Sequence, residues 1–403
     1  MTFKKELLNR LIDKYEKSKS FNYSSNRRIM LKREEISQFV NFENYIEKEI
    51  FIREIKELKS TGLIDFSWQK YEEDNLIDVI WLIIENVSES YKITGRKNLK
   101  NVSKDIKECL NEYVVYIKCE WIKEFFKDQI EYLDLKNKET KYLNFENYKD
   151  IIKALLFVDQ NTDLLERVFS MKCFENSKYY EKNVKSKIIR IIKDYLLKDL
   201  AEEYTDEEAL LEVGIYKYPE IFEFNGNIQI EIDGKVEQYY LINRGSYINS
   251  VATSLITKIE FHNIKRVLFI ENKANYIDYI MKEQKEDELV IWHGGMYSPK
   301  KELLFKKIYE YAPKGICWEH WSDIDLGGFR IFNRLKKNIV PELKEYNMNL
   351  EVLKKMQDKC MTFDEKYSEK LEMMLQDDEY KEFHEVIKYM LDNKIRLEQE
   401  AFL

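Results

Sequence analysis

Glycine, proline and long apolar stretches are scarce in this chain. Its 403 residues include only 11 Gly and 4 Pro, so few positions interrupt regular structure and long helices are favoured. No stretch approaches the roughly 18 uninterrupted apolar residues of a membrane-spanning helix, and we expect no membrane span. The first 20 residues are charged and amphipathic without the apolar core of a signal peptide, which argues against secretion.

Cysteine is also sparse, with five residues scattered along the chain and no C-x-x-C spacing. An odd, scattered set does not fit a disulfide framework or a zinc site, so we interpret these residues as reduced thiols. Together with the missing signal peptide, this predicts a cytoplasmic protein. The five are Cys109, Cys119, Cys173, Cys317 and Cys360.

The formal net charge of −8 argues against a protein that coats nucleic acid by bulk charge. The charge is unevenly spread, because residues 1–33 contain ten Lys or Arg and three Asp or Glu. Residues 351–403 contain nine basic and fourteen acidic residues. A basic N-terminal region can bind a phosphate backbone locally, although charge alone favours a solvated helix face. The candidates for contact with double-stranded DNA are Arg27, Arg28, Lys32 and Arg33.

The length and pattern of the chain predict three domains, at 1–95, 96–200 and 205–403. Apolar spacing predicts helices over 3–19 and 44–60, with a short basic strand near residue 31 between them. Gly62 is a plausible end of the second helix, and 63–68 alternates like a strand. This order outlines a winged helix, a fold that often binds DNA, although purely structural modules share it.

Residues 76–200 look helical nearly throughout, with one apolar face around Ile80, Leu82 and Val87 and another over 151–158. The aromatic residues among lysines in 121–127 could stack nucleic-acid bases, but aromatics at helical spacing are more commonly core. We therefore predict a helical middle region without a defined function.

The third predicted domain differs from the middle region because its sequence contains strand patterns. Residues 221–232 predict a hairpin around Asn225-Gly226, and Asp233-Gly234 offers a second turn. From residue 264 onward strands alternate with helices, which is typical of an α/β domain with a parallel sheet and right-handed crossovers. The predicted strands are 267–270, 289–292, 315–321 and 348–353, and the helices are 276–281, 299–311 and 329–335.

Three carboxylates stand where this pattern places the carboxyl ends of strands. Glu271 follows the run 266–270, and Asp323 and Asp325 follow the run 315–321. Ligands bind at the carboxyl edge of such sheets, and clustered carboxylates suit Mg²⁺ or Mn²⁺. Metal ions beside a phosphodiester activate water and stabilise the leaving oxygen, as in metal-dependent nucleases. The alternative is that Asp323 or Asp325 only caps the helix over 328–339.

Several neighbouring residues complete the hypothesis. Gly327 and Gly328 would let the backbone and a helix N-terminus approach a phosphate. His293 and His320 follow or end strands and could contact a scissile phosphate or orient water, although structural roles are the commoner alternative. The charged run 396–400 reads as a helix that is solvated or faces a dimer partner rather than as part of the site.

A strand-end Glu followed by a D-x-D resembles the Toprim domain of topoisomerases, primases and some nucleases. Longer matches are similar to one family, JetD, called MksG in related operons. The C-terminal matches are 269–273, 292–295, 321–331 and 396–400, and the weaker N-terminal ones are Ser25–Ile29 and 58–64. Ser322 departs from the glycine expected in the family's turn.

The resemblance implies a divalent-metal-dependent endonuclease that cuts closed-circular plasmid DNA as the nuclease subunit of a Wadjet defence system. It implies an SMC-kleisin-type (JetABC-like) motor partner, a homodimer and kinship with the topoisomerase VI A subunit. Glu271, Asp323 and Asp325 would bind the metal and be catalytic, and Lys273 would contact DNA. Two alternatives stay open, a tyrosine-dependent transesterase and a non-catalytic DNA-binding subunit. None of the 28 Tyr stands in a distinguishing motif, which favours hydrolysis.

Overall fold

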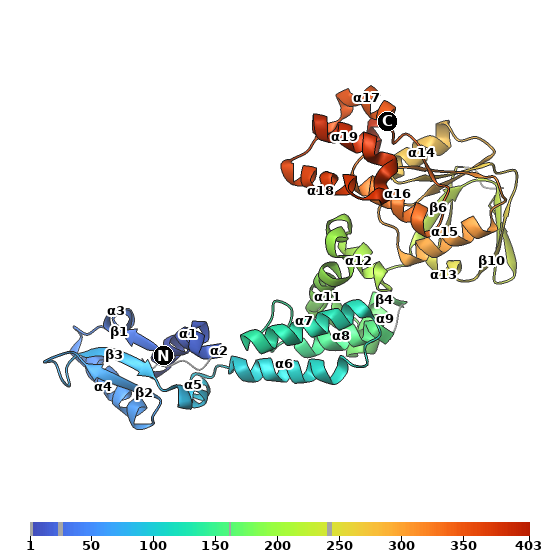
Figure 1. Cartoon of the computed structure of the whole chain (residues 1–403). Helices are drawn as coiled ribbons and strands as arrows, with labels where there is room; N and C mark the ends of the chain where they lie inside the picture. The colour runs from blue at the N-terminus through green and yellow to red at the C-terminus, as the bar shows by residue number, and fades with distance from the viewer. Residues whose placement is uncertain (1–2, 23–26, 161–162, 240–243) are drawn as a thin grey trace. The chain divides into compact units, whose positions relative to one another are not determined.

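The computed structural model describes residues 3–22, 27–160, 163–239 and 244–403. The chain forms two compact units, Met1–Gln160 with Asn183–Ile191, and Asn161–Lys182 with Ile192–Leu403 (Figure 1). The finer division into three domains remains a prediction. Ser25 and Asn26, part of the N-terminal resemblance, lie outside the described residues.

The first unit opens with the elements that the sequence predicts. Helix α1 (Phe3–Lys17) buries one apolar face, and α4 (Tyr45–Ser60) begins at Asn44, whose side chain accepts two backbone N–H bonds. Gly62 follows α4 with a left-handed φ of +69°, a backbone conformation that glycine adopts without strain. The helix and turn are confirmed, whereas the assignment to a winged helix remains a prediction.

A three-stranded antiparallel sheet lies beside these helices, and it corrects one expectation. Its order is β1 (Met30–Lys32), β3 (Ile77–Leu82) and β2 (Ile64–Trp68). The predicted helical face through Ile80 and Leu82 is therefore wrong. The run from Ile77 is rich in β-branched and aromatic residues, and it is the central strand of the sheet, where such side chains pack well.

The remaining helices of the first unit confirm the predicted helical middle region from residue 87 onward. They pack through their apolar faces, as α8 does with Ile151, Ile152 and Leu155. The helices from residue 87 onward are α5 (Val87–Thr94), α6 (Leu99–Tyr113), α7 (Glu120–Lys136), α8 (Tyr148–Gln160) and α11 (Lys185–Ile191). Two short helices come earlier in this unit, α2 (Lys19–Asn22) and α3 (Arg33–Ile36).

The second unit is built on a six-stranded mixed sheet. Four neighbouring strands are parallel, β14, β13, β11 and β12, and β6 and β9 extend the sheet antiparallel. The central strand β11 is buried along Val267–Ile270, as expected for a strand covered on both faces. The bounds are β6 (Ile221–Asn225), β9 (Ser246–Asn249), β11 (Arg266–Ile270), β12 (Glu288–Trp292), β13 (Cys317–Trp321) and β14 (Lys344–Glu345).

The predicted hairpin at Asn225-Gly226 is wrong in its pairing, although both of its strands exist. Strand β6 joins the large sheet, whereas β7 (Ile228–Ile232) pairs with β8 (Lys235–Gln238) and β10 (Ile256–Phe261) in a second sheet. The hairpin forms instead at Asp233-Gly234, where both residues have positive φ. That is the backbone of a type I′ turn, whose twist matches that of the paired strands.

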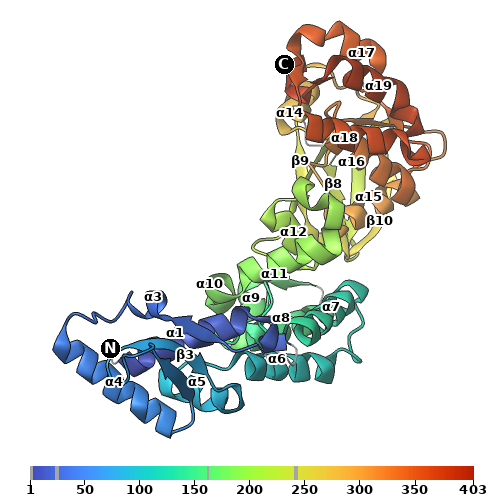
Figure 2. The same ribbon diagram turned by 60° about the vertical axis from the view of Figure 1, so that its left-hand side comes forward.

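Helices follow the strands of the large sheet as the sequence predicts, with one correction. Residues 348–353 were expected to form a fourth strand, but α17 (Leu350–Lys355) occupies this place, and Asn349 caps it. The fourth parallel strand is the short β14. Helices α17, α18 and α19 form one group in both views, with α19 between α17 and α18 (Figures 1 and 2). The helices of this unit are α9 (Glu166–Phe174), α10 (Tyr179–Asn183), α12 (Asp206–Glu212), α13 (Ser250–Thr253), α14 (Lys273–Lys282), α15 (Pro299–Tyr311), α16 (Leu326–Asn338), α17, α18 (Glu365–Leu375) and α19 (His384–Asn393).

Arg266 ties the parallel strands together at their amino ends. Its guanidinium pairs with Glu288 of β12 at 2.8 Å and with Glu319 of β13, and it donates to the Tyr279 hydroxyl. Because Glu288 is almost fully buried, this pairing satisfies a charge that would otherwise be costly. The carboxyl ends of the same strands are thereby held in register. The mixed α/β class is confirmed, and the Toprim assignment remains a prediction.

Candidate active site

The carboxyl ends of β11 and β13 bring the predicted carboxylates to one edge of the sheet. Ile270 is in register with Trp321, and the Glu271 backbone N–H donates to the Trp321 carbonyl at 3.0 Å. Glu271 therefore directly follows one strand, while Asp323 lies two residues beyond the end of its neighbour. The parallel register alone is enough to place these two side chains near each other.

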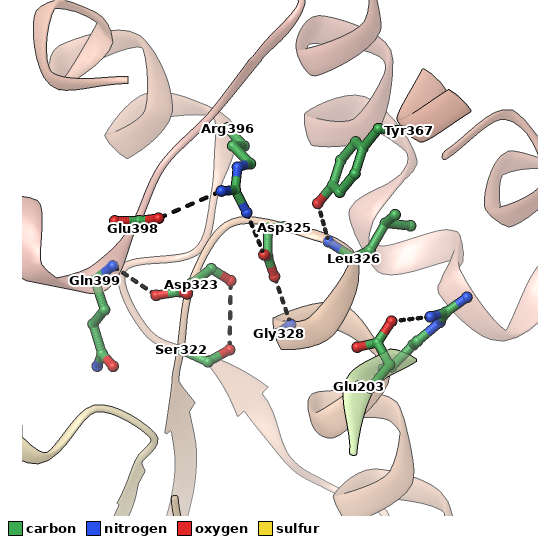
Figure 3. Close-up of polar contacts among 11 residues, drawn as sticks. Glu203, Ser322, Asp323, Asp325, Leu326, Gly328, Tyr367, Arg396, Glu398 and Gln399 are labelled. Atoms are coloured by element: carbon green, nitrogen blue, oxygen red, sulfur yellow. Dashed lines mark hydrogen bonds and ion pairs between the residues drawn. The ribbon is translucent and has the colours of Figure 1, made fainter. Parts of the chain in front are cut away.

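The D-x-D turn joins β13 to α16. Asp325 is extended, with φ −157° and ψ −179°, and its Oδ1 accepts the Gly328 backbone N–H at 2.9 Å (Figure 3). Asp325 is thus the N-cap of α16, which is the alternative role that its sequence position allowed. Between the two aspartates, buried Ile324 pairs with Leu397 through two backbone hydrogen bonds.

Gly328 allows the turn to close tightly. A Cβ at this position would lie 2.1 Å from the Asp323 carbonyl oxygen and 2.5 Å from Ser322 Oγ, so no larger residue fits without movement. At Gly327 a Cβ would meet only the ends of two carboxylate side chains, at 3.2 and 3.3 Å. Ser322, which replaces an expected glycine, is buried with its hydroxyl 3.4 Å from Met348 Sδ. It therefore packs inside the turn.

The C-terminal segment 396–400 lies against these carboxylates, which corrects its predicted role as a solvated helix. Ile395–Arg396 is strand β16, and the 3-10 helix η7 (Gln399–Phe402) begins only at Gln399. The Gln399 backbone N–H donates to Asp323 Oδ1 at 2.7 Å, and Arg396 pairs with Asp325 Oδ2 at 3.3 Å (Figure 3). Arg396 also reaches Glu398, at 3.4 Å.

Burial and like charge raise the proton affinity of two of the carboxylates. Burial, followed by the charges of Asp323 and Asp325, raises the pKa of Glu271 to about 8. Burial and Asp325 raise the pKa of Asp323 to about 7, although its hydrogen bond from Gln399 opposes this. Glu400 raises the pKa of both groups further. The three predicted site carboxylates therefore interact electrostatically.

Two of the three predicted carboxylates have the properties of ligands for a divalent cation. In the described part of the chain, no three His, Cys, Asp or Glu side chains converge to hold an ion by themselves. One buried oxygen of Glu271, Oε2, nevertheless has no hydrogen-bond partner, and its neighbours are negative. Mg²⁺ commonly takes one or two carboxylates and completes its shell with water. Glu271 and Asp323 match that donor set, whereas Asp325 already caps α16 and pairs with Arg396.

The other predicted site residues lie in different surroundings. His293 and His320 are fully buried and face each other, with their Nε2 atoms 3.1 Å apart. Burial lowers the pKa of His293 to about 3, so the ring is neutral at physiological pH. Lys273 pairs with Glu223 and lies 4.2 Å from the centre of the Trp292 ring. The roles predicted for the histidines and for Lys273 remain predictions.

A basic pocket in the first unit gathers three of the four N-terminal cations predicted to contact DNA. Arg27, Arg28 and Lys32 line it, together with lysines of α1 and α2. Arg33 is not among the lining residues and donates instead to Gln69. Six basic side chains face one acidic one, Glu35, which is paired with Lys14. The charged lining residues are Lys14, Lys17, Lys19, Arg27, Arg28, Lys32 and Glu35.

Comparison with known proteins agrees with the motifs. Residues 235–403 match the family model described as "Wadjet protein JetD, C-terminal". A curated protein of Bacillus cereus (strain Q1), "Wadjet protein JetD", is 27% identical over 418 residues, covering 100% of this chain and 99% of that protein. Residues 235–403 therefore form a JetD C-terminal domain, and the whole chain is similar to Wadjet protein JetD. The region matched by the JetD model contains Glu271, both aspartates and the C-terminal segment.

Sequence reasoning missed the contribution of the C-terminal segment. Its charge suggested solvent exposure, because periodicity cannot reveal a contact between residues about 75 positions apart. A signal was present nonetheless, since the run 396–400 was one of the matches to the JetD family. Tyr367 was also missed: its hydroxyl accepts the Leu326 backbone N–H at 3.0 Å beside Asp325.

The close approach at Gly328 yields a test of the turn. We expect Gly328→Ala to distort the start of α16 and to lower the unfolding temperature of the second unit by several degrees, which corresponds to roughly 2–3 kcal/mol. Gly295→Ala is the control, because the nearest atom to its added Cβ would be Glu208 Oε1 at 3.6 Å, an ordinary contact. Thermal unfolding followed by circular dichroism measures both. Equal unfolding temperatures for the two variants would contradict the tight turn.

The raised pKa values predict how stability depends on pH without metal. Between about pH 4 and 8 the folded protein keeps protons on Glu271 and Asp323 that the unfolded chain has released, so stability falls as pH rises. In EDTA, Glu271→Gln should be more stable than wild type by roughly 1–3 kcal/mol at pH 8.5 and no more stable at pH 5. Chemical denaturation at both pH values measures this difference.

A matched control for the pH experiment is Glu310→Gln, which changes an exposed glutamate of α15. Its stability should follow that of wild type at both pH values. A wild-type stability that stays constant from pH 5 to 8.5 in EDTA would overturn the assignment of raised pKa values to this cluster.

Proposed function

We propose that this JetD-like protein is the nuclease subunit of a Wadjet-type defence complex, a divalent-metal-dependent endonuclease acting on closed-circular double-stranded DNA. The observation that carries the proposal is the meeting of Glu271 and Asp323 at the carboxyl edge of parallel strands. Burial and neighbouring carboxylates raise the pKa values of both groups, as expected for an Mg²⁺ or Mn²⁺ site without its metal.

The site residues would have different roles. Glu271 and Asp323 would hold the cation, while Asp325 and Arg396 fix the turn that carries Asp323. A bound divalent ion would neutralise phosphate charge and lower the pKa of a coordinated water, which would ease its deprotonation to the attacking hydroxide. Without a cation the local field is negative, so the phosphate backbone is repelled. Loss of metal should therefore abolish both the chemistry and productive seating of DNA.

Hydrolysis is favoured over a covalent tyrosyl intermediate. Among described tyrosines, Tyr367 is one that lies against the candidate site, and burial and Asp325 raise the pKa of its hydroxyl. A hydroxyl that already accepts the Leu326 N–H and resists ionisation is a poor nucleophile. A non-catalytic subunit is disfavoured because Glu271, Asp323 and Asp325 are all retained, whereas a decayed site would be expected to lose a carboxylate.

The similarity to JetD supports the proposed partners. The Bacillus cereus relative bears the name Wadjet protein JetD, and a Wadjet system is expected to contain several subunits. We propose that this chain acts as a homodimer with an SMC-kleisin-type motor that presents the DNA. No helix in residues 3–22, 27–160, 163–239 or 244–403 is long and apolar enough to cross a membrane.

The basic pocket of the first unit supports contact with duplex DNA. Six basic residues against one carboxylate give a local positive charge on a chain whose net charge is negative. Such a surface binds phosphates without reading bases, so we expect weak sequence preference and strong salt dependence. Arg28 is packed over the Trp81 ring at 4.5 Å, which orients it at the edge of the small sheet.

Plasmid cleavage tests the catalytic proposal directly. Purified protein, alone and with its candidate SMC partner complex, is incubated with supercoiled plasmid in Mg²⁺, Mn²⁺ or EDTA. We expect nicking or linearisation only with metal, and its loss by at least roughly 100-fold in Glu271→Gln/Asp323→Asn, because both proposed metal ligands are neutralised. Agarose gels after protease treatment quantify the products.

The same reactions distinguish the alternatives. Quenching with denaturant before proteolysis should leave no protein attached to DNA ends, whereas a tyrosyl intermediate would. The Glu310→Gln variant should cut as wild type does. If the complete complex fails to cut with either metal, or the double variant cuts equally well, the proposed nuclease is wrong.

Salt dependence tests the basic pocket. Lys17→Gln/Lys19→Gln should weaken duplex binding several-fold at about 100 mM salt and reduce the slope of log K against log salt by about 1 to 2. Lys56→Gln/Lys59→Gln is the matched control, because these lysines of α4 pair with Asp74 and Asp65 outside the pocket. Fluorescence anisotropy with a labelled duplex measures both. Equal slopes for the two double variants would contradict DNA contact at the pocket.

A further inference from the structure

Gln399 is a buried residue within a charged C-terminal segment. Its exposed fraction is 1%, whereas Glu400 beside it is exposed and Glu398 is partly exposed. A buried polar side chain is costly unless its hydrogen bonds are made, so its presence here needs a specific reason.

Four polar atoms of Gln399 each make a hydrogen bond, namely the backbone N and O and the side-chain Nε2 and Oε1. Its backbone N–H donates to Asp323 Oδ1 at 2.7 Å, and its carbonyl accepts from Asn275 Nδ2 at 2.8 Å. The side-chain Nε2 donates to the Trp321 carbonyl at 3.2 Å, and Oε1 accepts the Asn272 backbone N–H at 2.8 Å. One residue therefore joins the ends of β13 and β11 and the first turn of α14.

The side-chain amide lies where the two parallel strands separate. Their last direct contact is the bond from the Glu271 N–H to the Trp321 carbonyl. One residue farther along, the Asn272 N–H has no strand partner opposite it and bonds to Gln399 instead. The amide thus acts as one more rung between the strands. It fixes the spacing of the two backbones at the positions from which Glu271 and Asp323 extend.

We propose that Gln399 is a positioning residue that sets the geometry of Glu271 and Asp323 for a divalent cation. The inference rests on the proposed function and deepens it, because it extends the site to the C-terminal segment. Gln399 touches neither substrate nor metal; it acts by holding the backbone on both sides of the carboxylates and by orienting Asp323 directly.

The chemistry of the amide explains why glutamine is needed. One group must donate to the Trp321 carbonyl while accepting from the Asn272 N–H. An ionised glutamate can only accept, so it would repel the Trp321 carbonyl and add negative charge to the cluster. Methionine has a similar length and forms neither bond. Asparagine is one methylene shorter and cannot span the same gap.

The experiment measures metal binding rather than cleavage. Mn²⁺ affinity is determined by electron paramagnetic resonance and calorimetry for the full-length wild type, Gln399→Met and Gln399→Glu. Loss of an orienting residue behind metal ligands commonly costs roughly 10–100-fold in affinity, and we expect Gln399→Met to fall in this range. Hydrogen exchange in EDTA should be faster in the peptides around 271–275 and 321–325.

Gln284→Met provides a matched control for loss of stability. Gln284 also bridges backbone and side chain at the sheet, donating to the Asn225 and Glu288 carbonyls and accepting from Asn225 Nδ2. It lies just before β12, at the amino end of the sheet. Its replacement should lower the unfolding temperature comparably but leave Mn²⁺ affinity within about twofold of wild type.

The outcomes separate this inference from the proposed function. If wild type binds Mn²⁺, Glu271→Gln abolishes binding and Gln399→Met binds like wild type, the positioning role is overturned while the metal site stands. If wild type binds no Mn²⁺ at this site, and Glu271→Gln changes nothing, the proposed function itself fails. If Gln284→Met loses affinity as strongly as Gln399→Met, the effect is general destabilisation and the inference is overturned.

Discussion

Crowding of like charge at the edge of the parallel sheet is the constraint on which the site depends. Hydrogen bonding between β11 and β13 ends at Trp321, and directly beyond it Glu271 and Asp323 stand in partly buried surroundings. Burial alone disfavours an ionised carboxylate, and a second charge nearby disfavours it more. The raised pKa values of both groups express this conflict. Other contacts in the second unit must therefore hold the strands together against the repulsion between these carboxylates.

Two sets of contacts supply that restraint, one at each end of the strands. At the amino ends, Arg266 joins β11 to Glu288 and Glu319 of its two neighbours. At the carboxyl ends, the bonds of Gln399 and the pairing of Ile324 with Leu397 hold the turn from a distant part of the sequence. Protonation of a carboxylate would remove the repulsion at a smaller free-energy cost than unfolding. The folded state therefore tolerates the cluster near neutral pH.

Local patterns in the sequence were sufficient to predict much of this arrangement. The buried run ending at Ile270, the helices that follow each strand and the D-x-D ahead of two glycines all lie where expected. These features are decided by nearest neighbours, by periodicity and by a parallel topology that collects strand ends at one edge. The site could be located for that reason, whereas its ligands and catalytic role remain predictions.

Pairing between distant segments could not be read in the same way. The Asn225-Gly226 turn looked like a hairpin, but β6 found partners in β12 and β9, which lie far along the chain. The central strand β3 looked helical because a short apolar run does not reveal its period. The C-terminal segment looked solvated because charge patterns do not show that Gln399, between two acidic residues, is buried. In each case tertiary contacts outweighed local preference.

Arg396 shows how the two aspartates of one motif come to differ. Its guanidinium pairs with Asp325, which also accepts the Gly328 N–H, so both oxygens of Asp325 already have partners. Asp323 has the Gln399 N–H on one oxygen and carries a raised pKa. A cation arriving at this edge therefore gains more from Asp323 and Glu271, whose charges are less compensated, than from Asp325. On this argument Asp325 serves the site by capping α16 and anchoring the C-terminal segment, and the first aspartate of the D-x-D is the stronger candidate ligand.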